Sequence, residues 1–435
     1  MLIKNNIIQY LKNAILSGKS EEFIFSYYQE VNLKKEWKNL VSHKKQIFHI
    51  NYPDNTGYIG FGICKAYNIK SKNDLRKLIS KKLNHQTYGD KKKISLKLFG
   101  GVSFNFRKKS NTIWSDTPKS LFYLPELLLV RDKDNYYLSF NKILNKNSDL
   151  NKIHLEYENY IREINDFNHK NCNNDISFSI DNPDRIEYEK NFNSYLTNIK
   201  SKNIEKVILS RSKIFKTKND INLINNTPES TNFKIKLNDD KYFFGSTPEI
   251  LIKTYKKKYN TLALAGTLIK NKKNIKNNLL NDKKELKEHQ YVVNHIMRVL
   301  NPYSSKISFS EKPKILTLKH LYHLSTPISG TLKNKLHIID LLLKLYPTPA
   351  VLGSPKKEAL KLILQHETID RGWYSGCIGW FDLDGNGRFD VAIRSALQHK
   401  KTIHFYAGGG ILKESNLEKE WDETESKFLQ LLSIL

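Results

Sequence analysis

The chain has 435 residues, 39% of them hydrophobic, and a net charge of +28. Its length and composition allow a large core in two or three domains. The charge raises the possibility of a nucleic-acid or anionic-membrane partner. However, lysine is spread along the whole sequence together with asparagine, in short separated runs. This distribution favours a solvated basic surface, so no nucleic-acid partner is expected.

The cysteines and the apolar segments exclude several further classes. Cys64, Cys172 and Cys377 are far apart and form no CxxC pair, so neither a zinc site nor a disulfide framework is predicted. No apolar run approaches about 18 residues, and the N-terminus lacks the apolar region of a signal peptide. We therefore expect a cytoplasmic protein with no membrane partner.

The first fifty residues are lysine-rich and are predicted to be helical, because Ile7, Ile8, Leu11 and Ile15 recur at helical spacing. Two strands broken by glycine are predicted over 57–66 and 93–106, and a pair of strands joined by a turn over 121–131 and 136–140. The polar segment 141–181 is predicted to contain a helix over 153–164, followed by an exposed connection.

The pattern becomes sharper after residue 182, where helices and strands alternate without repeats or a long linker. The predicted elements are a helix over 186–199, strands over 205–212, 242–251 and 261–267, a helix begun by a capping box at Asp282 and Glu285, a Pro/Gly loop over 323–330, a helix with Ser354 as N-cap and Pro355 as first residue, and strands over 374–381, 388–397 and 402–408. Mixing of this kind favours one large α/β domain.

The segment DLDGNG over 382–387 superficially matches the start of a calcium-binding loop. The twelfth position of such a loop requires a bidentate Glu, and here it is Ile393. Because strands and not helices flank the segment, a hairpin turn is the better interpretation. The phosphate-binding patterns GxGxxG and GxxxxGK[ST] and the GxSxG nucleophile motif are absent from the chain.

The C-terminal segment 402–427 combines a strand, a turn of three glycines from Gly408 to Gly410, and a helix. Glu420, Glu423 and Lys427 share one face of this helix. Two carboxylates and an ammonium on one face can hold a divalent cation together with the anion that it carries. The alternative is a glycine turn followed by a solvated helix.

Lys206 lies on a strand that otherwise reads Val-Ile-Leu. It is either a strand-end lysine that reaches solvent or a desolvated amine that acts as a base. Glu249 follows an apolar strand, Glu288 and His289 lie on the capped helix, and His323 lies in the Pro/Gly loop. Each of these residues by itself is more often structural, so their joint presence is the informative feature.

These residues belong to motifs that occur in the order and approximate spacing of the chorismate-utilising enzymes, which the chain resembles. The motifs are KVILSR (206–211), STPE (246–249), LAGT (264–267), Glu288-His289, HLSTP (323–327), PTPA (347–350), IRS (393–395), YAGGG (406–410) and EWDE (420–423). The resemblance is dense over about 185–435, thinner over 55–140, and missing from 1–50 and 141–181.

The resemblance implies one domain over 1–435, with a divergent part (1–181) and a motif-bearing part (182–435). Its implied fold is an α/β (α+β) domain of two large, packed, mainly antiparallel sheets with helices outside. The implied substrate is chorismate, and the implied cofactor is Mg²⁺. The metal ligands would be Glu288 and Glu423 with Glu420 nearby.

The resemblance also assigns roles around the substrate. Glu249 would protonate the leaving C4 hydroxyl, Lys206 would activate water for attack at C2, and His323 would donate a hydrogen bond. The residues that would hold the substrate are Arg394, Lys427, Tyr374, Gly266, Thr267, Gly408 and Gly410.

Two positions indicate the branch of the family. Amine-using relatives carry Gln at the position of Lys206, and aminodeoxychorismate synthases typically carry a nucleophilic Lys at the position of Ala265. Lys206 with Ala265 therefore implies water as nucleophile, the isochorismate synthase reaction, and no glutamine amidotransferase partner. A monomer is expected. The alternatives are a salicylate synthase, which would go on to eliminate pyruvate, and a non-catalytic nucleic-acid-binding protein.

Overall fold

The computed structural model describes residues 7–17, 21–33, 36–40, 45–80, 83–89, 95–106, 112–166, 175–201, 204–218, 221, 227–270 and 276–435. The elements up to residue 182 are α1 (Ile7–Ser17), β1 (Phe23–Glu30), α2 (Trp37–Leu40), β2 (Gln46–Asn51), β3 (Thr56–Ile69), α3 (Lys72–Ser80), β4 (His85–Gly89), β5 (Lys97–Val102), β6 (Ser120–Asp132), β7 (Asn135–Leu144), α4 (Leu150–Asp166) and β8 (Ile176–Asn182).

The remaining elements carry most of the sequence motifs. They are α5 (Arg185–Ser201), β9 (Lys206–Thr217), β10 (Thr231–Asn238), β11 (Lys241–Thr247), β12 (Ile250–Tyr255), β13 (Lys258–Ile269), the 3₁₀ helix η1 (Lys276–Asn281), α6 (Lys283–Leu300), η2 (Asn301–Tyr303), β14 (Ser304–Phe309), β15 (Lys314–Thr317), β16 (Leu321–Leu332), α7 (Ile338–Leu345), β17 (Gly353–Ser354), α8 (Lys356–His366), β18 (Cys377–Asp382), β19 (Gly387–Val391), β20 (Ser395–His399), β21 (Thr402–Ile411) and α9 (Leu417–Leu432).

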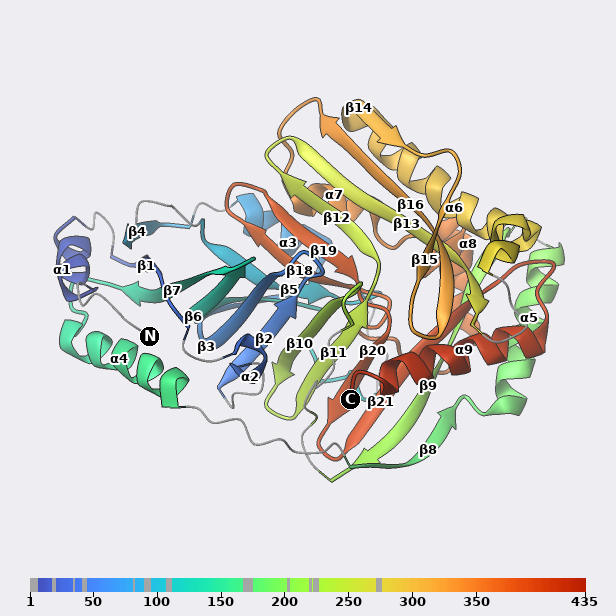
Figure 1. Cartoon of the computed structure of the whole chain (residues 1–435), viewed down its shortest axis with the longest axis horizontal. Helices are drawn as coiled ribbons and strands as arrows, with labels where there is room; N and C mark the ends of the chain where they lie inside the picture. Colours follow the sequence, from blue (N-terminus) through green and yellow to red (C-terminus); the bar gives the residue numbers. More distant parts are fainter. Residues whose placement is uncertain are drawn as a thin grey trace.

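The strands form two layers that meet at β6 (Figure 1). One layer runs β9–β21–β20–β11–β10–β2–β3, and the other runs β5–β18–β19–β12–β13–β16. Strand β6 pairs with β3 along one edge and with β5 and β7 along the other, so the described strands form one hydrogen-bonded network. Among the described pairings, β1–β4 is parallel and the others are antiparallel. The predicted fold class, mainly antiparallel layers with helices outside, is confirmed.

Aromatic side chains fill the space between the layers. The Phe48 ring of β2 stacks on the Phe99 ring of β5, with centroids 4.4 Å apart and planes 20° apart. Phe233 and Phe243 belong to the same buried cluster, which also takes in Ile378 of β18. Offset stacking of this kind adds to the free energy gained by burying the rings. The two layers are therefore held together by a packed apolar core.

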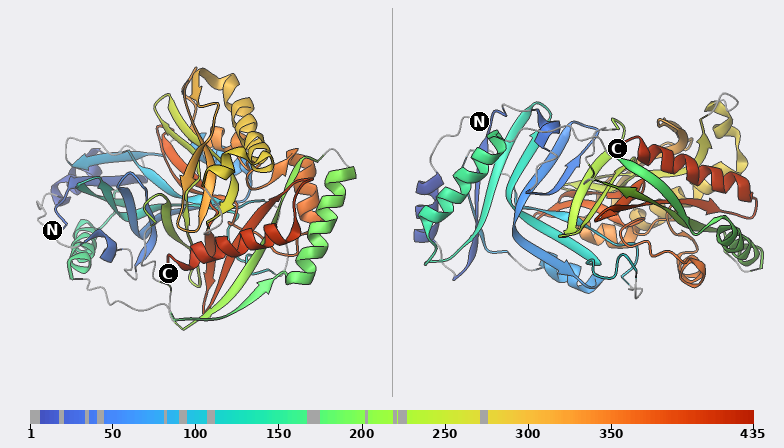
Figure 2. Two further views of the ribbon diagram at one scale, coloured as in Figure 1. Left: turned by 45° about the vertical axis from the view of Figure 1, so that its right-hand side comes forward. Right: turned by 90° about the horizontal axis from the view of Figure 1, so that it is seen from below.

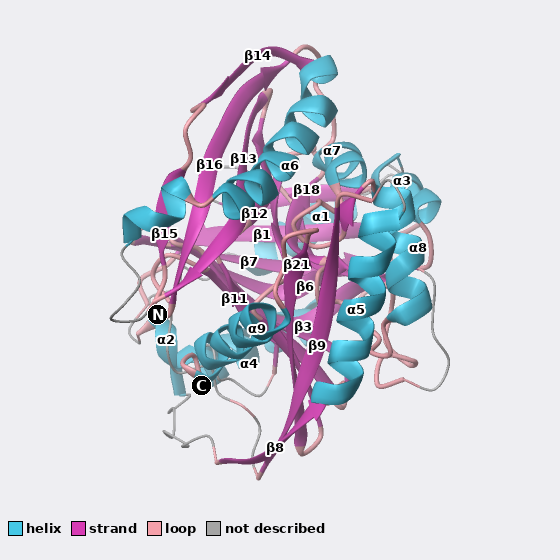
Figure 3. Ribbon diagram, turned by 90° about the vertical axis from the view of Figure 1, so that its right-hand side faces the viewer, coloured by secondary structure: helices cyan, strands magenta, loops and turns pink. Residues whose placement is uncertain are grey.

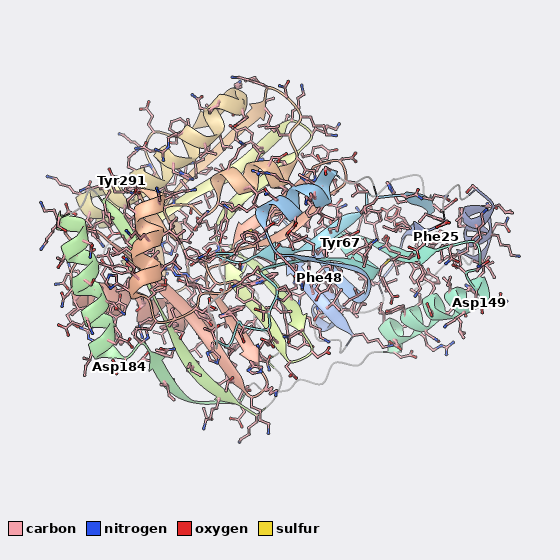
Figure 4. The ribbon with its side chains drawn as sticks, turned by 180° about the vertical axis from the view of Figure 1, so that it is seen from behind. Phe25, Phe48, Tyr67, Asp149, Asp184 and Tyr291 are labelled. Atoms are coloured by element: carbon pink, nitrogen blue, oxygen red, sulfur yellow. The ribbon has the colours of Figure 1, made fainter. Side chains whose placement is uncertain are left out.

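Helices cover the outer faces of the strands (Figure 2 and Figure 3). Helices α5 and α8 pack against β9, α9 packs against β21, and α6 and α7 pack against β12, β13 and β19. Helices α1 and α4 cover β1 and β7 at the N-terminal end. Asp149 and Asp184, labelled in Figure 4, begin α4 and α5 by accepting backbone N–H groups. No helix in the described ranges is both long and apolar enough to cross a membrane.

Several predicted elements differ in the structure. The helix predicted over 1–50 is confirmed for α1, but Phe23–Glu30 and Gln46–Asn51 are strands. Both strands are buried along nearly their whole length, which removes the polar/apolar alternation that marks a strand. Part of the connection predicted before 182 is strand β8, and residues 167–174 of that connection lie outside the described residues.

The segment 323–330 was predicted to be a loop and lies in strand β16. Pro327 is tolerated there because of where the neighbouring strands end. On that edge β15 pairs with residues 322–325 and β14 pairs from Ile328 onward. Pro327 therefore falls in the gap between two partners, where no N–H donor is required.

We expect Leu342→Ala to lower the free energy of unfolding by about 2–5 kcal/mol, because the side chain is fully buried between α7 and the strands. Leu155→Ala on α4 is the matched control. Leu155 is 55% exposed, so this change should cost less than about 0.5 kcal/mol. Denaturant unfolding of both variants tests the assignment of the core. Equal losses would contradict it.

Candidate functional site

Most of the residues singled out in the sequence line a single pocket. Parts of β13, β16 and β21 contribute to this pocket, together with one face each of α6 and α9. These elements come from segments far apart in the chain (Figure 1). The predicted site residues that line it are Glu249, Gly266, Thr267, Glu288, His323, Tyr374, Arg394, Gly408, Gly410, Glu423 and Lys427. The structure thus gathers the residues of the separate motifs. Lys206 and Glu420 lie directly behind this lining.

Lys206 is fully buried, and its ammonium lies 2.8 Å from Glu288 Oε1 of α6. Gly410 lies between the two side chains. A Cβ there would be 2.5 Å from Glu288 Oε1 and 2.8 Å from the Lys206 Cε atom. The lysine is therefore not a strand-end residue that reaches solvent. It is desolvated, and the ion pair offsets much of the cost of burying its charge.

Four carboxylates gather between α6 and α9, each next to a cation or a backbone donor. Glu423 pairs with Lys427, and Glu420 accepts from Lys284 at 2.8 Å and from Ser415 at 2.8 Å. Glu285 accepts the Thr267 N–H at 2.7 Å. Burial raises the pKa of Glu285 and of Glu420, and neighbouring carboxylates raise it further. Burial alone would raise the pKa of Glu288 too, but Lys206 and Lys284 hold it below its usual range.

The donor set suits a divalent cation. The Glu420 Oε2 atom is buried without a hydrogen-bond partner, and a Cβ at Gly409 would approach it to 2.8 Å. An unpaired buried carboxylate oxygen is costly unless a cation or a donor reaches it. As the side chains stand, no group of three or more His, Cys, Asp or Glu in the described ranges is close enough to ligate one ion. Lysines occupy the oxygens of Glu288, Glu420 and Glu423 instead.

Arg394 also lines the pocket, and its backbone has φ 50° between β19 and β20. One of its nitrogens donates to Gln430 Oε1 at 2.7 Å and another to His323 Nε2 at 2.8 Å. Because a guanidinium only donates, His323 Nε2 accepts, and its Nδ1–H donates to Thr267 Oγ1 at 3.1 Å. Burial lowers the pKa of His323 well below its usual value, and Arg394 lowers it further, so the ring is neutral.

Glu249 is 2% exposed, directly after β11. Burial raises its pKa to about 8, although Lys206 and Arg394 act in the opposite direction. The carboxyl is therefore protonated at neutral pH and can give up a proton to a group in the pocket. Tyr374, which also lines the pocket, stacks on Tyr406 with ring centroids 5.3 Å apart.

The local structure differs from several sequence-based expectations. Gly408–Gly410 form no turn. They continue β21 and pair with Ile208–Ser210 of β9, so side chains of α6 and α9 can lie against them. The strand predicted over 388–397 is broken at 392–394, and the break exposes Arg394 to the pocket.

The caps also differ in part. Asp282 caps α6 as predicted, but the Glu285 side chain turns to Thr267 and not back to the cap. Pro355, not Ser354, is the N-cap of α8. The DLDGNG turn between β18 and β19 is confirmed as a hairpin.

Sequence reasoning missed the contributions of Lys284, Glu285 and Gln430 to this site. His289 donates to the Ala265 carbonyl, which belongs to the bulge that turns at Gly266 with φ +82°. A polar residue on the buried face of a helix is the one signal that could have identified them. Glu285 was instead attributed to the capping box at the start of the helix.

The chain matches the family described as chorismate binding enzyme over residues 10–435. It belongs to that family. Isochorismate synthase MenF of Bacillus subtilis (strain 168) is 31% identical over 350 residues, 78% of this chain and 74% of that protein. Isochorismate synthase EntC of Escherichia coli (strain K12) is 31% identical over 243 residues, 53% of this chain and 62% of that protein. The structure of menaquinone-specific isochorismate synthase MenF from Escherichia coli has the same fold, with a TM-score of 0.79 over 98% of each chain at 22% identity.

We expect Gly410→Ala to keep the fold but to displace the Lys206–Glu288 pair, because the new methyl group would meet only the far ends of two flexible side chains. Gly100→Ala is the contrasting variant. There the methyl group would lie 1.8 Å from the Leu121 carbonyl oxygen of the adjacent strand, so the melting temperature should fall strongly. A crystal structure and melting curves test both expectations. An unchanged 2.8 Å separation of Lys206 and Glu288 in Gly410→Ala would contradict the first.

Proposed function

We propose that this chain converts chorismate to isochorismate, adding water at C2 as the C4 hydroxyl leaves. The observation that carries the proposal is that a buried protonated carboxyl, Glu249, lines the pocket and a buried lysine, Lys206, lies directly behind that lining. A reaction that adds water at one carbon and expels hydroxide from another requires both a base and an acid. Membership of the family and the relatives named above support the substrate.

Lys206 would take the proton from the attacking water, and Glu249 would give its proton to the departing C4 oxygen. A lysine accepts a proton only as the neutral amine, so its pairing with Glu288 must change before the reaction. Glu249 already holds its proton at neutral pH in its buried position. The two residues would thus perform opposite proton transfers across the same ring.

Arg394, Lys427 and Tyr374 would hold a substrate carboxylate. Arg394 offers a planar pair of donors, and Gln430 and His323 fix its orientation. Glu288, Glu420 and Glu423 would hold Mg²⁺, which when bound would neutralise the ring carboxylate of the substrate. The lysines that now neutralise these carboxylates would have to give way. The unpartnered Glu420 Oε2 supports this assignment.

Two features favour water over an amine as nucleophile. Lys206 supplies a base that ammonia would not need. At Ala265 the pocket lining has only a methyl group, so this position supplies no nucleophile for a covalent adduct. The alternative of a further elimination of pyruvate to give salicylate is not favoured by the two relatives named above, both of which are isochorismate synthases. One incubation with chorismate and Mg²⁺, without ammonia, tests the proposal. Isochorismate identified by NMR supports it, whereas pyruvate release or anthranilate would overturn it.

We expect Lys206→Gln to retain chorismate binding and to lose turnover by a factor of about 10²–10⁴, the usual contribution of a positioned base. Lys213→Gln is the matched control, because it removes a lysine from the same strand that pairs with Glu425 instead. Product formation and chorismate binding are measured for both variants. Near wild-type production by Lys206→Gln would show that the base lies elsewhere.

The pKa of Glu249, raised to about 8 by burial, predicts an alkaline limit to activity. Because the acid must be protonated, kcat/KM should be sustained below about pH 8 and should fall as the pH rises through that value. Glu249→Gln, which has no acidic proton, should lose most turnover at every pH. A kcat/KM that keeps rising well above pH 8 in the wild type would argue against Glu249 as the acid.

We expect Glu288→Gln and Glu423→Gln each to raise the Mg²⁺ concentration needed for half-maximal activity, because a neutral amide is a weaker ligand than a carboxylate. Glu425→Gln is the control on α9, since Glu425 pairs with Arg211 and Lys213 away from the pocket. Calorimetric titration with Mg²⁺ gives a second readout without turnover. Equal magnesium dependence in all three variants would refute the ligand assignment.

A further inference from the structure

Strand β9, which carries Lys206, has one continuous edge and one interrupted edge. On the continuous edge β21 pairs with residues 207–216. On the other edge β17 pairs with Lys206 and Val207, and β8 begins to pair only at Ser212. On this second edge, between β17 and β8, no described strand pairs with the backbone of residues 208–211. Buried backbone groups left without partners would be costly there.

Two side chains occupy the gap. Glu367 Oε1 accepts the Ser210 N–H at 2.9 Å, and Arg371 Nη2 donates to the Ile208 carbonyl at 2.8 Å. Glu367 and Arg371 also bind each other, with Arg371 Nε 2.7 Å from Glu367 Oε2. One acceptor and one donor thus serve the two backbone groups that a neighbouring strand would have served. The side-chain pair takes the place of a short piece of missing strand.

The same pair is also connected to the far wall of the pocket. Arg371 Nη1 donates to the Val351 carbonyl at 2.7 Å, and the Arg371 carbonyl accepts the Tyr374 N–H at 2.8 Å. Val351 and Tyr374 both line the pocket. The buried pair therefore joins the strand of Lys206 to the Val351 segment, and Arg371 is itself part of the turn that ends at Tyr374.

Stability alone does not explain an ion pair in this position. Both side chains are about 2% exposed, and burying two charges gives little or no net stabilisation. Such a pair does impose direction, because a guanidinium and a carboxylate bind in fixed planar geometry. The two side chains make three directed hydrogen bonds to two segments that line or adjoin the pocket, namely to Ile208 and Ser210 of β9 and to Val351.

We propose that Glu367 and Arg371 are positioning residues for the reaction, which set the place of Lys206 relative to the substrate-holding turn at Tyr374. This inference rests on the proposed function and adds to it two residues that touch neither substrate nor metal. A displacement of about 1 Å in a reacting group can cost a factor of about 10² in rate. Loss of the pair should therefore lower kcat while the carboxylate-holding groups, and with them KM, change little.

Arg371→Lys and Glu367→Asp test the proposal, because each keeps its charge but cannot make the same set of bonds. Each should lower kcat about 10- to 100-fold with little change in KM. Hydrogen exchange of the Ser210 amide, followed by mass spectrometry of the peptide 206–212, should become faster in both. Asn141→Ala is the matched control. Asn141 is a buried side chain of β7 that donates to the Pro125 carbonyl of β6, so its loss should affect stability but not kcat.

The outcomes separate the two levels of inference. If the wild type makes no isochorismate, the proposed function fails, and the exchange measurement still reports whether the pair protects β9. If the wild type is active but both variants have the kcat of Asn141→Ala, the positioning role is overturned. Unchanged Ser210 exchange in both variants would overturn it as well, because it would show that β9 does not depend on the pair.

Discussion

The ion pair between Lys206 and Glu288 is the interaction on which the arrangement of this site depends. A fully buried ammonium is tolerated only with a close counter-charge, here at 2.8 Å. That requirement fixes α6 against β9 and leaves room for no side chain at Gly410. Lys206 is thereby held out of water, directly behind the pocket lining.

The rest of the charge in the site follows from the same balance. Four carboxylates of α6 and α9 face three lysines, so with every group ionised the cluster carries one excess negative charge. The carboxylates are Glu285, Glu288, Glu420 and Glu423, and the lysines are Lys206, Lys284 and Lys427. Burial and mutual repulsion raise the pKa of Glu285 and Glu420, which reduces that charge further. A divalent cation that displaced a lysine would make the cluster less costly. The basic surface of the chain would in turn favour the approach of an anionic substrate.

The layered strands provide the rigidity that such a site needs. The pocket is lined from β13, β16 and β21 and from breaks at 248–249 and 392–394, where a strand stops and a functional side chain turns inward. Each break leaves backbone groups to be satisfied in another way. At β9 the Glu367–Arg371 pair does this, and near Gly266 the His289 side chain supports the bulge. Buried polar side chains therefore replace regular sheet pairing where function interrupts it.

The sequence by itself determined the fold class, the identity of the residues that meet in the pocket, and the helices α4, α5, α6 and α9. Helical periodicity and motif order are local properties that survive without knowledge of the partner strands. It failed for β1, β2 and β16, because strands buried on both faces, or carrying a proline between two partners, lose the alternation that identifies them.

Tertiary structure alone decided that Gly408–Gly410 extend a strand, that Glu285 serves Thr267, and that Arg394 binds His323. Each of these outcomes depends on which distant segment comes within hydrogen-bond distance. A local sequence pattern does not predict which segment that will be. The same holds for Glu367 and Arg371, whose spacing along the chain indicates only a pair at the end of a helix. Their contact with β9, 157 residues away from Ser210 to Glu367, exists only in the folded protein.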